Sequence, residues 1–249
     1  MGLEIKIYSC GEIATGLCSR ALPAEEVHVW YQHLKGESAD VGPFQGLLSA
    51  DEQDKACRFH FDRHRNDFTV TRGTLRILLA SYLAKPPESF DFSYSAQGKP
   101  ALANIDTNLR FNVSHTDGLA ALAFTRGREI GVDVEKMRPN LEAEKLAERF
   151  FSESERQFIS RLTGRALDEA FFRCWTRKEA FIKAKGGGLS IPLHQFDVSI
   201  AEDQPTALLG TRPDPSEARR WSLHNLPVKP GYAGALAVSV IDKGGDAQN

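Results

Sequence analysis

Ile130-Gly131-Val132-Asp133-Val134-Glu135 alternates residue by residue, with an isoleucine and two valines at every second position. This is the period of a β-strand with one apolar face. Asp133 and Glu135 therefore share the opposite face, with their Cα atoms about 6.6 Å apart. The pattern predicts a strand that buries one side and displays two carboxylates on the other.

These two carboxylates suit a hard cation. Mg²⁺ takes oxygen ligands, usually one or two carboxylates supplemented by water and by the phosphate oxygens of a substrate. Taken alone, Asp133 and Glu135 are explained more simply as the solvated face of an edge strand. A further carboxylate brought to the same place would favour the metal site.

A helix expected downstream carries such a carboxylate. Phe172, Trp175, Glu179 and Ile182 are spaced i, i+3, i+7 and i+10, so Glu179 falls within an otherwise apolar stripe. Lys183 lies four residues after Glu179, so the two side chains share a face and can act on one ligand. A helix-surface ion pair is the simpler explanation of the pair alone, and the apolar stripe counts against it.

Candidates for phosphate binding lie upstream. Gly98-Lys99-Pro100 puts a cation beside a rigid turn, and Asn112-Val113-Ser114-His115 ends a strand with a hydroxyl and an imidazole. A run of cations also extends from Lys55 to Arg76. Each has a structural alternative: turns use glycine and proline for backbone reasons, a strand-end histidine is commonly structural, and helical spacing scatters the cations around the axis.

Hydrophobic periodicity and capping residues predict the other elements. Strands are expected at residues 5–8, 26–31, 90–95, 109–113, 120–124, 129–135, 195–200, 220–225 and 232–241. Helices are expected at residues 49–59, 65–84, 141–150, 154–162 and 167–184. No low-complexity linker or internal repeat is visible in the sequence.

Composition narrows the class of protein. The 249 residues are 41% hydrophobic and 26% charged, which is ordinary for a globular protein. A net charge of -2 gives no global basic surface for nucleic acid or an anionic membrane, and no stretch approaches the roughly 20 apolar residues that span a bilayer. The four cysteines show no zinc-site pairing and no disulfide density. We expect a soluble cytoplasmic protein.

Four blocks occur in an order that resembles the 4′-phosphopantetheinyl transferase family. They are Gly98-Lys99-Pro100, Phe111-Asn112-Val113-Ser114-His115, Gly131-Val132-Asp133-Val134-Glu135, and Trp175-Thr176-Arg177-Lys178-Glu179-Ala180-Phe181-Ile182-Lys183 followed by Gly186 to Leu189. They look like the larger single-chain branch, which includes the surfactin-synthetase-activating enzymes. Phe150-Phe151-Ser152-x-x-Glu155 and the helix at 49–59 also look familial, and the resemblance runs from about residue 47 to 200.

The resemblance implies transfer of the phosphopantetheine arm of coenzyme A, the co-substrate, to a serine of an apo acyl or peptidyl carrier protein, with release of 3′,5′-ADP. Asp133, Glu135 and Glu179 would hold Mg²⁺ on the pyrophosphate of coenzyme A. Lys183 would contact the same phosphates, and Glu179 would accept the serine proton. Asp133, Glu179 and Lys183 are therefore the expected catalytic residues.

The resemblance also implies a binding site for the nucleotide of coenzyme A. Lys99, Ser114 and His115 would bind the nucleotide and its phosphates, while Lys55 and Arg72 would reach the 3′-phosphate. The implied fold is α+β, a pseudo-twofold pair of similar halves at residues 1–116 and 117–249 with the active site between them. Family members of this kind are monomers.

Three other functions use the same features. A nucleotide phosphohydrolase would direct water, in place of a serine, at the phosphorus. A silent coenzyme A binding module would bind without transfer, which the intact Asp133, Glu135, Glu179 and Lys183 argue against. An adaptor built on the Arg-rich helix is disfavoured by the near-neutral net charge.

Overall fold

The computed structural model describes residues 3–11, 20–138 and 142–240. The chain divides into two compact units, Met1–Gly127 and Arg128–Asn249. The division implied by the family resemblance falls after residue 116. The structure puts it after Gly127 because the strand at Leu119–Arg126 pairs with two strands of the first unit.

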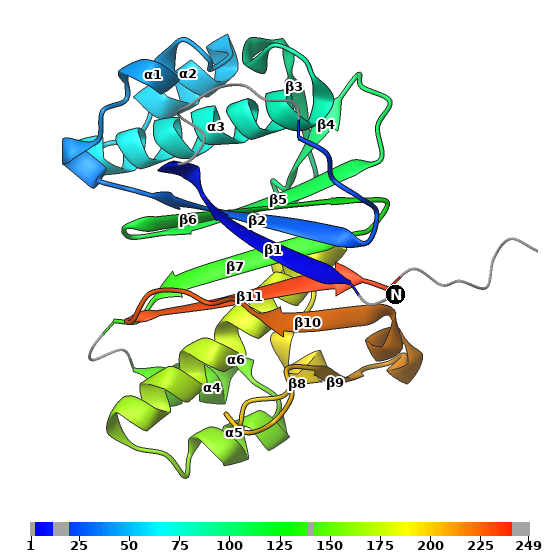
Figure 1. Cartoon of the computed structure of the whole chain (residues 1–249). Coiled ribbons are helices and arrows are strands. Elements are labelled where there is room, and N and C mark those ends of the chain that lie inside the picture. The colour runs from blue at the N-terminus through cyan, green and yellow to red at the C-terminus, as the bar shows by residue number, and fades with distance from the viewer. Residues whose placement is uncertain (1–2, 12–19, 139–141, 241–249) are drawn as a thin grey trace, which may run out of the picture. The chain divides into compact units, whose positions relative to one another are not determined.

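The first unit is a mixed α+β structure. Its elements are β1 (Glu4–Ser9), β2 (Glu26–His33), α1 (Gly42–Gln45), α2 (Ala50–Cys57), α3 (Asp62–Leu83), β3 (Asp91–Tyr94), β4 (Pro100–Ala103), β5 (Leu109–Thr116) and β6 (Leu119–Arg126). Four strands form a sheet in the order β1-β2-β6-β5, parallel between β1 and β2 and antiparallel elsewhere, while β3 and β4 pair separately. Helices α1 to α3 lie on one face of the larger sheet (Figure 1).

A hydrophobic core joins this sheet to α3. Trp30, Leu122 and Phe124 of the strands are buried together with Leu75 and Leu79 of the helix. The helical period of the α3 leucines places them on the side that meets the sheet. The long helix is therefore fixed by its packing, and with it the charged residues of its other faces.

The second unit contains the acidic strand. Its elements are β7 (Ile130–Lys136), α4 (Ala143–Phe150), α5 (Glu153–Ile159), α6 (Gly164–Lys185), β8 (Phe196–Val198), β9 (Leu208–Thr211), β10 (Trp221–Asn225) and β11 (Tyr232–Ser239). The order β10-β11-β7 makes an antiparallel sheet, and β8 pairs with β9. Helix α6 packs on β7 and β11, where Phe171, Phe181 and Ala235 enter one core (Figure 1).

The α+β class predicted from the sequence is confirmed, and each expected strand and helix has a counterpart with shifted ends. Among the α-helices and strands of the described residues, three short ones were not predicted: α1, β4 and β9. Each has only four residues, too few to repeat a hydrophobic period. No helix in the described ranges is both long enough and apolar enough to cross a membrane.

Both units contain a buried carboxylate at the start of a short helix. Glu52 accepts a hydrogen bond from the backbone N–H of Ser49, the residue before α2, and lies 2.8 Å from Nε of Arg76. Glu155 in the same way accepts from the N–H of Ser152 and lies 2.8 Å from Nζ of Lys178. Each carboxylate therefore ties a short helix to the long helix that follows it.

Replacing Lys178 by methionine should destabilise the fold, because Glu155 would be left buried, at 2% exposure, without its cation. Breaking a buried pair in this way costs about 3–5 kcal/mol. Thermal unfolding followed by circular dichroism measures the change. Lys145→Met is the matched control, since Lys145 pairs with Glu142 on the surface and its loss should change the midpoint little. Equal shifts in the two variants would contradict the assignment.

Candidate active site

Gly131 lets α6 lie directly on β7. A Cβ atom built at Gly131 would be 2.1 Å from the carbonyl oxygen of Ala180 and 2.3 Å from the backbone nitrogen of Ala184. Only glycine permits such a close approach of two backbones. Because alternate residues of a strand share a face, Asp133 and Glu135 lie on the face of β7 that α6 covers.

Lys183 of α6 is paired with Asp133 in this structure. Its Nζ lies 2.6 Å from Oδ1 of Asp133, whose side chain is 4% exposed against 30% for the lysine. A hydrogen bond from an ammonium to a buried carboxylate is among the stronger polar contacts in a protein. The pair holds the middle of β7 to the last turns of α6.

Glu179 completes a cluster of three carboxylates and one ammonium. Burial and, after it, the negative charges of Asp133 and Glu135 raise its pKa to about 7, and only Lys183 acts in the opposite direction. The helix carries Glu179 one turn before Lys183, on the side that faces the acidic strand. At neutral pH this carboxyl group can therefore both take up and release a proton.

The donor atoms of the acidic cluster have the chemistry that a hard divalent cation prefers, since all three candidate ligands are carboxylates. A cation there would also offset the repulsion that raises the pKa of Glu179. In the conformation seen here, no three His, Cys, Asp or Glu side chains of the described residues are arranged to hold a metal ion. Asp133, Glu135 and Glu179 would have to turn towards a common point, with Lys183 leaving Asp133.

Arg177 and Lys178, which precede Glu179, anchor α6 on its buried sides. Lys178 is fully buried and donates to the carbonyl oxygens of Leu193 and Phe196 at 2.7 and 2.5 Å. Arg177 donates to the carbonyl oxygen of Ser199, and to Asn225 at 2.9 Å. Both side chains fix the rotation of the helix and hence the direction in which Glu179 points.

The sequence analysis did not assign these anchoring roles. Most partners of Arg177 and Lys178 are backbone carbonyls and side chains 15 to 48 residues later in the chain. No local spacing reveals such contacts. In the sequence, Glu155 can be recognised only as the last residue of the segment Phe150-Phe151-Ser152-x-x-Glu155.

The residues assigned from the resemblance to the nucleotide of coenzyme A belong to the first unit, whereas Lys183, assigned to its pyrophosphate, belongs to the second. Lys55 is exposed in the last turn of α2, and its Nζ lies 5.4 Å from the ring centroid of Phe68. Arg72 is 8% exposed, and its Nε lies 3.3 Å from Glu52. Arg72 thus has a carboxylate partner, Glu52, within the protein. The resemblance predicted only a phosphate as its partner.

Lys99, Ser114 and His115 lie on the hairpin of β3 and β4 and on strand β5. Lys99 follows Gly98, whose φ of +80° forms the turn, and its backbone N–H donates to Oγ of Ser95 at 3.1 Å. Ser114 is buried and His115 is exposed, because neighbouring residues of a strand point to opposite faces. Strand β5 continues to Thr116, three residues past the expected bound at Val113, so the motif lies at the end of the strand, directly before the turn.

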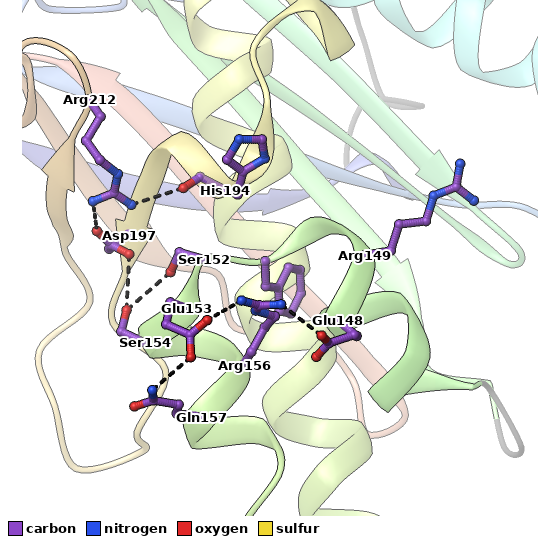
Figure 2. A pocket seen from close by; sticks show the side chains of 11 residues that line it. Glu148, Arg149, Ser152, Glu153, Ser154, Arg156, Gln157, His194, Asp197 and Arg212 are labelled. Carbon is purple, nitrogen blue, oxygen red and sulfur yellow. Dashed lines mark hydrogen bonds and ion pairs between the residues drawn. The ribbon is translucent and has the colours of Figure 1, made fainter.

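A different hollow of the second unit, of about 750 Å³, contains none of the predicted site residues (Figure 2). Most of its lining charges are paired with one another: Arg212 lies 2.6 Å from Asp197, and Arg156 bonds to both Glu148 and Glu153. Arg149 points away from these pairs in Figure 2. The internal pairing leaves this hollow without a preference for an anionic or a cationic ligand.

Comparisons with known proteins match both units. A family model described as 4′-phosphopantetheinyl transferase superfamily matches residues 129–238, and one described as 4′-phosphopantetheinyl transferase, N-terminal matches residues 39–126. The chain is 36% identical over 220 residues to the 4′-phosphopantetheinyl transferase HetI of Nostoc sp., covering 88% of this chain and 90% of that protein. It is 29% identical over 203 residues to the 4′-phosphopantetheinyl transferase Sfp of Bacillus subtilis, covering 80% and 85%.

Gly131→Ala should destabilise the second unit, because the added methyl group collides with the backbone of α6. Overpacking of this kind costs about 1–3 kcal/mol. Gly210→Ala is the matched control in the same unit, where the nearest atom to a new Cβ is 3.8 Å away. Thermal unfolding compares the two. The close approach would be refuted by equal midpoints for both variants.

Glu179→Gln should change how stability depends on pH in metal-free protein. The folded pKa of about 7 lies above the ordinary value of 4.5, so the folded state binds the proton more tightly than the unfolded chain does. Glu179 therefore makes wild type lose stability as pH rises from about 4.5 to about 7. Melting curves in EDTA at pH 4 to 8 should show the free energy of unfolding of the variant rising relative to that of wild type by roughly 3 kcal/mol over this window, since each pKa unit is worth about 1.4 kcal/mol. A constant difference at every pH would oppose the assignment.

Proposed function

The chain belongs to the 4′-phosphopantetheinyl transferase superfamily, and from this premise we propose that it transfers phosphopantetheine from coenzyme A to a serine of an apo acyl or peptidyl carrier protein. The observation that carries the proposal is the coupled group of Asp133, Glu135, Glu179 and Lys183 on facing elements of the second unit. Such a group can hold phosphate oxygens and move one proton.

The proposed reaction exchanges the phosphoanhydride bond in the pyrophosphate of coenzyme A for a phosphate ester of serine. The serine oxygen of the carrier forms a bond to the β-phosphorus of coenzyme A, and the bond from that phosphorus to 3′,5′-ADP breaks. The serine loses its proton, and the leaving 3′,5′-ADP keeps the electron pair of the broken bond. The enzyme must accept that proton and stabilise the negative charge that develops on the phosphate oxygens.

Glu179 is the proposed proton acceptor. A general base works best when its pKa lies near the operating pH, and in the metal-free protein burial together with two neighbouring carboxylates raises the pKa of Glu179 to about 7. Lys183 is the proposed contact for the phosphate charge, since its ammonium lies within the same cluster and remains partly exposed to an incoming ligand. The anchors Arg177 and Lys178 keep both side chains at fixed positions along α6.

Mg²⁺ is part of the proposal, with Asp133, Glu135 and Glu179 as the residues that would hold it. When bound, the ion supplies positive charge to the phosphate oxygens. Lys55, Arg72, Lys99, Ser114 and His115 are proposed to bind the nucleotide of coenzyme A. Their support is the resemblance of their motifs to the family, and the predictions of a monomer and of a cytoplasmic location stay predictions.

The proposal is tested by intact-protein mass spectrometry of an apo carrier protein incubated with this chain, coenzyme A and Mg²⁺. We expect the carrier to gain one phosphopantetheine group. Addition of EDTA, or the Asp133→Ala substitution, should abolish the gain. Hydrolysis of coenzyme A without transfer would favour a phosphohydrolase, and binding without either reaction would favour a silent binding module.

Glu179→Gln should lower kcat for carrier modification by about 10²–10⁴, because the amide cannot accept the serine proton. The KM for coenzyme A should change much less, since Lys183 and the nucleotide-binding residues remain. Initial rates measured with a fluorescent coenzyme A derivative separate the two constants. A variant that keeps the wild-type kcat would exclude Glu179 as the base.

A further inference from the structure

Tyr94 is an exposed aromatic residue in the first unit. It ends β3, pairs with Pro100 of β4, and is 43% exposed, whereas Phe92 two residues earlier on the same face is partly buried. Large exposed aromatic rings are candidates for contact with a ligand, because flat apolar surface gains most from being covered. The surroundings of Tyr94 decide which ligand fits.

Two cations of different helices flank this ring. Nζ of Lys55 in α2 lies 5.9 Å from the ring centroid, and the guanidinium carbon of Arg72 in α3 lies 6.0 Å from it. Both cations also lie over Phe68, at 5.4 and 5.8 Å. No carboxylate pairs with Lys55 in the part of the chain that the structure describes. The patch therefore combines an aromatic surface with positive charge.

Arg72 has an unused donor in this patch. Its Nε faces Glu52 at 3.3 Å, and its Nη2 lies 3.4 Å from the hydroxyl of Tyr94. Its Nη1 is buried and has no hydrogen-bond partner among the described residues. A buried guanidinium N–H left unpaired is unfavourable, so this donor favours the arrival of an acceptor on a ligand.

A hollow lies beside the patch along α2. It has a volume of about 510 Å³, and it is lined by Asp51, Asp54, Lys55, Arg58 and Phe59. This volume is in the range of sites for small ligands. The carboxylate of Asp51 accepts a hydrogen bond from the hydroxyl group of Ser49, so part of its negative charge is already stabilised within the protein.

We propose that Tyr94 is a stacking platform for the purine base of the coenzyme A nucleotide, with Lys55 and Nη1 of Arg72 binding the phosphate next to that base. The proposal rests on the proposed function and adds a residue that lies outside the motifs used to recognise the family. A base and a phosphate on one sugar match the combination of an aromatic ring and two cations. Tyr94 thus sets the affinity for the nucleotide without taking part in the phosphate exchange.

Isothermal titration calorimetry with 3′,5′-ADP and with 5′-ADP tests this assignment. Tyr94→Leu should weaken the binding of both nucleotides about tenfold, since stacking on an aromatic ring is worth about 1–3 kcal/mol per base. Tyr94→Phe should stay within about twofold of wild type, because the ring is kept. Lys55→Gln should weaken only 3′,5′-ADP. Phe61→Leu is the matched control, since Phe61 is a 61% exposed aromatic ring of the same unit outside the patch.

Steady-state kinetics separate this proposal from the proposed function. Tyr94→Leu should raise the KM for coenzyme A about tenfold and leave kcat within about twofold. Transfer by wild type with an unchanged KM in Tyr94→Leu would overturn the role of Tyr94 alone. If wild type transfers to no apo carrier, the proposed function is overturned. The stacking is tested separately, and equal nucleotide affinities of wild type and Tyr94→Leu would overturn it.

Discussion

The contact of α6 with β7 across Gly131 is the constraint on which the candidate site depends. Without a side chain at that position, the helix backbone comes within van der Waals reach of the strand backbone. The strand then presents Asp133 and Glu135 to the helix, and the helix presents Glu179 and Lys183 to the strand. Both the position and the charge of the cluster follow from one missing methyl group together with the periods of a strand and a helix.

The cluster itself is unfavourable for folding. Three carboxylates share one ammonium, and the repulsion and burial appear as the raised pKa of Glu179. The rest of the second unit compensates with well-paired groups: Lys178 has three oxygen partners, and Arg177 bonds to the end of β10 at Asn225 and to the loop residues Ser199 and Thr206. Well-packed surroundings can hold an unfavourable arrangement of charges at a binding site. An isolated helix could not hold the same charges together.

The sequence predicted the parts of the site in which functional residue types fall within a clear hydrophobic period. The alternation from Ile130 to Glu135 predicted both the strand and the shared side of its carboxylates, and the apolar stripe around Glu179 predicted that this glutamate is not on the solvent face. Contacts between distant segments could not be predicted, since the partners of Lys178 are carbonyl oxygens, which every residue has. Very short strands such as β9 carry too little pattern, and the position of the division between units depends on which strands pair.

Synthesis on the ribosome delivers the first unit before the second, and domains of larger proteins commonly fold as they emerge. The buried Glu52 meets Arg76 only 24 residues later in the chain, and the described contacts of both side chains stay within the first unit. Glu52 therefore does not have to stay unpaired until a cation of the second unit has been synthesised. The nascent half can neutralise its own interior charges before the residues of the acidic cluster exist.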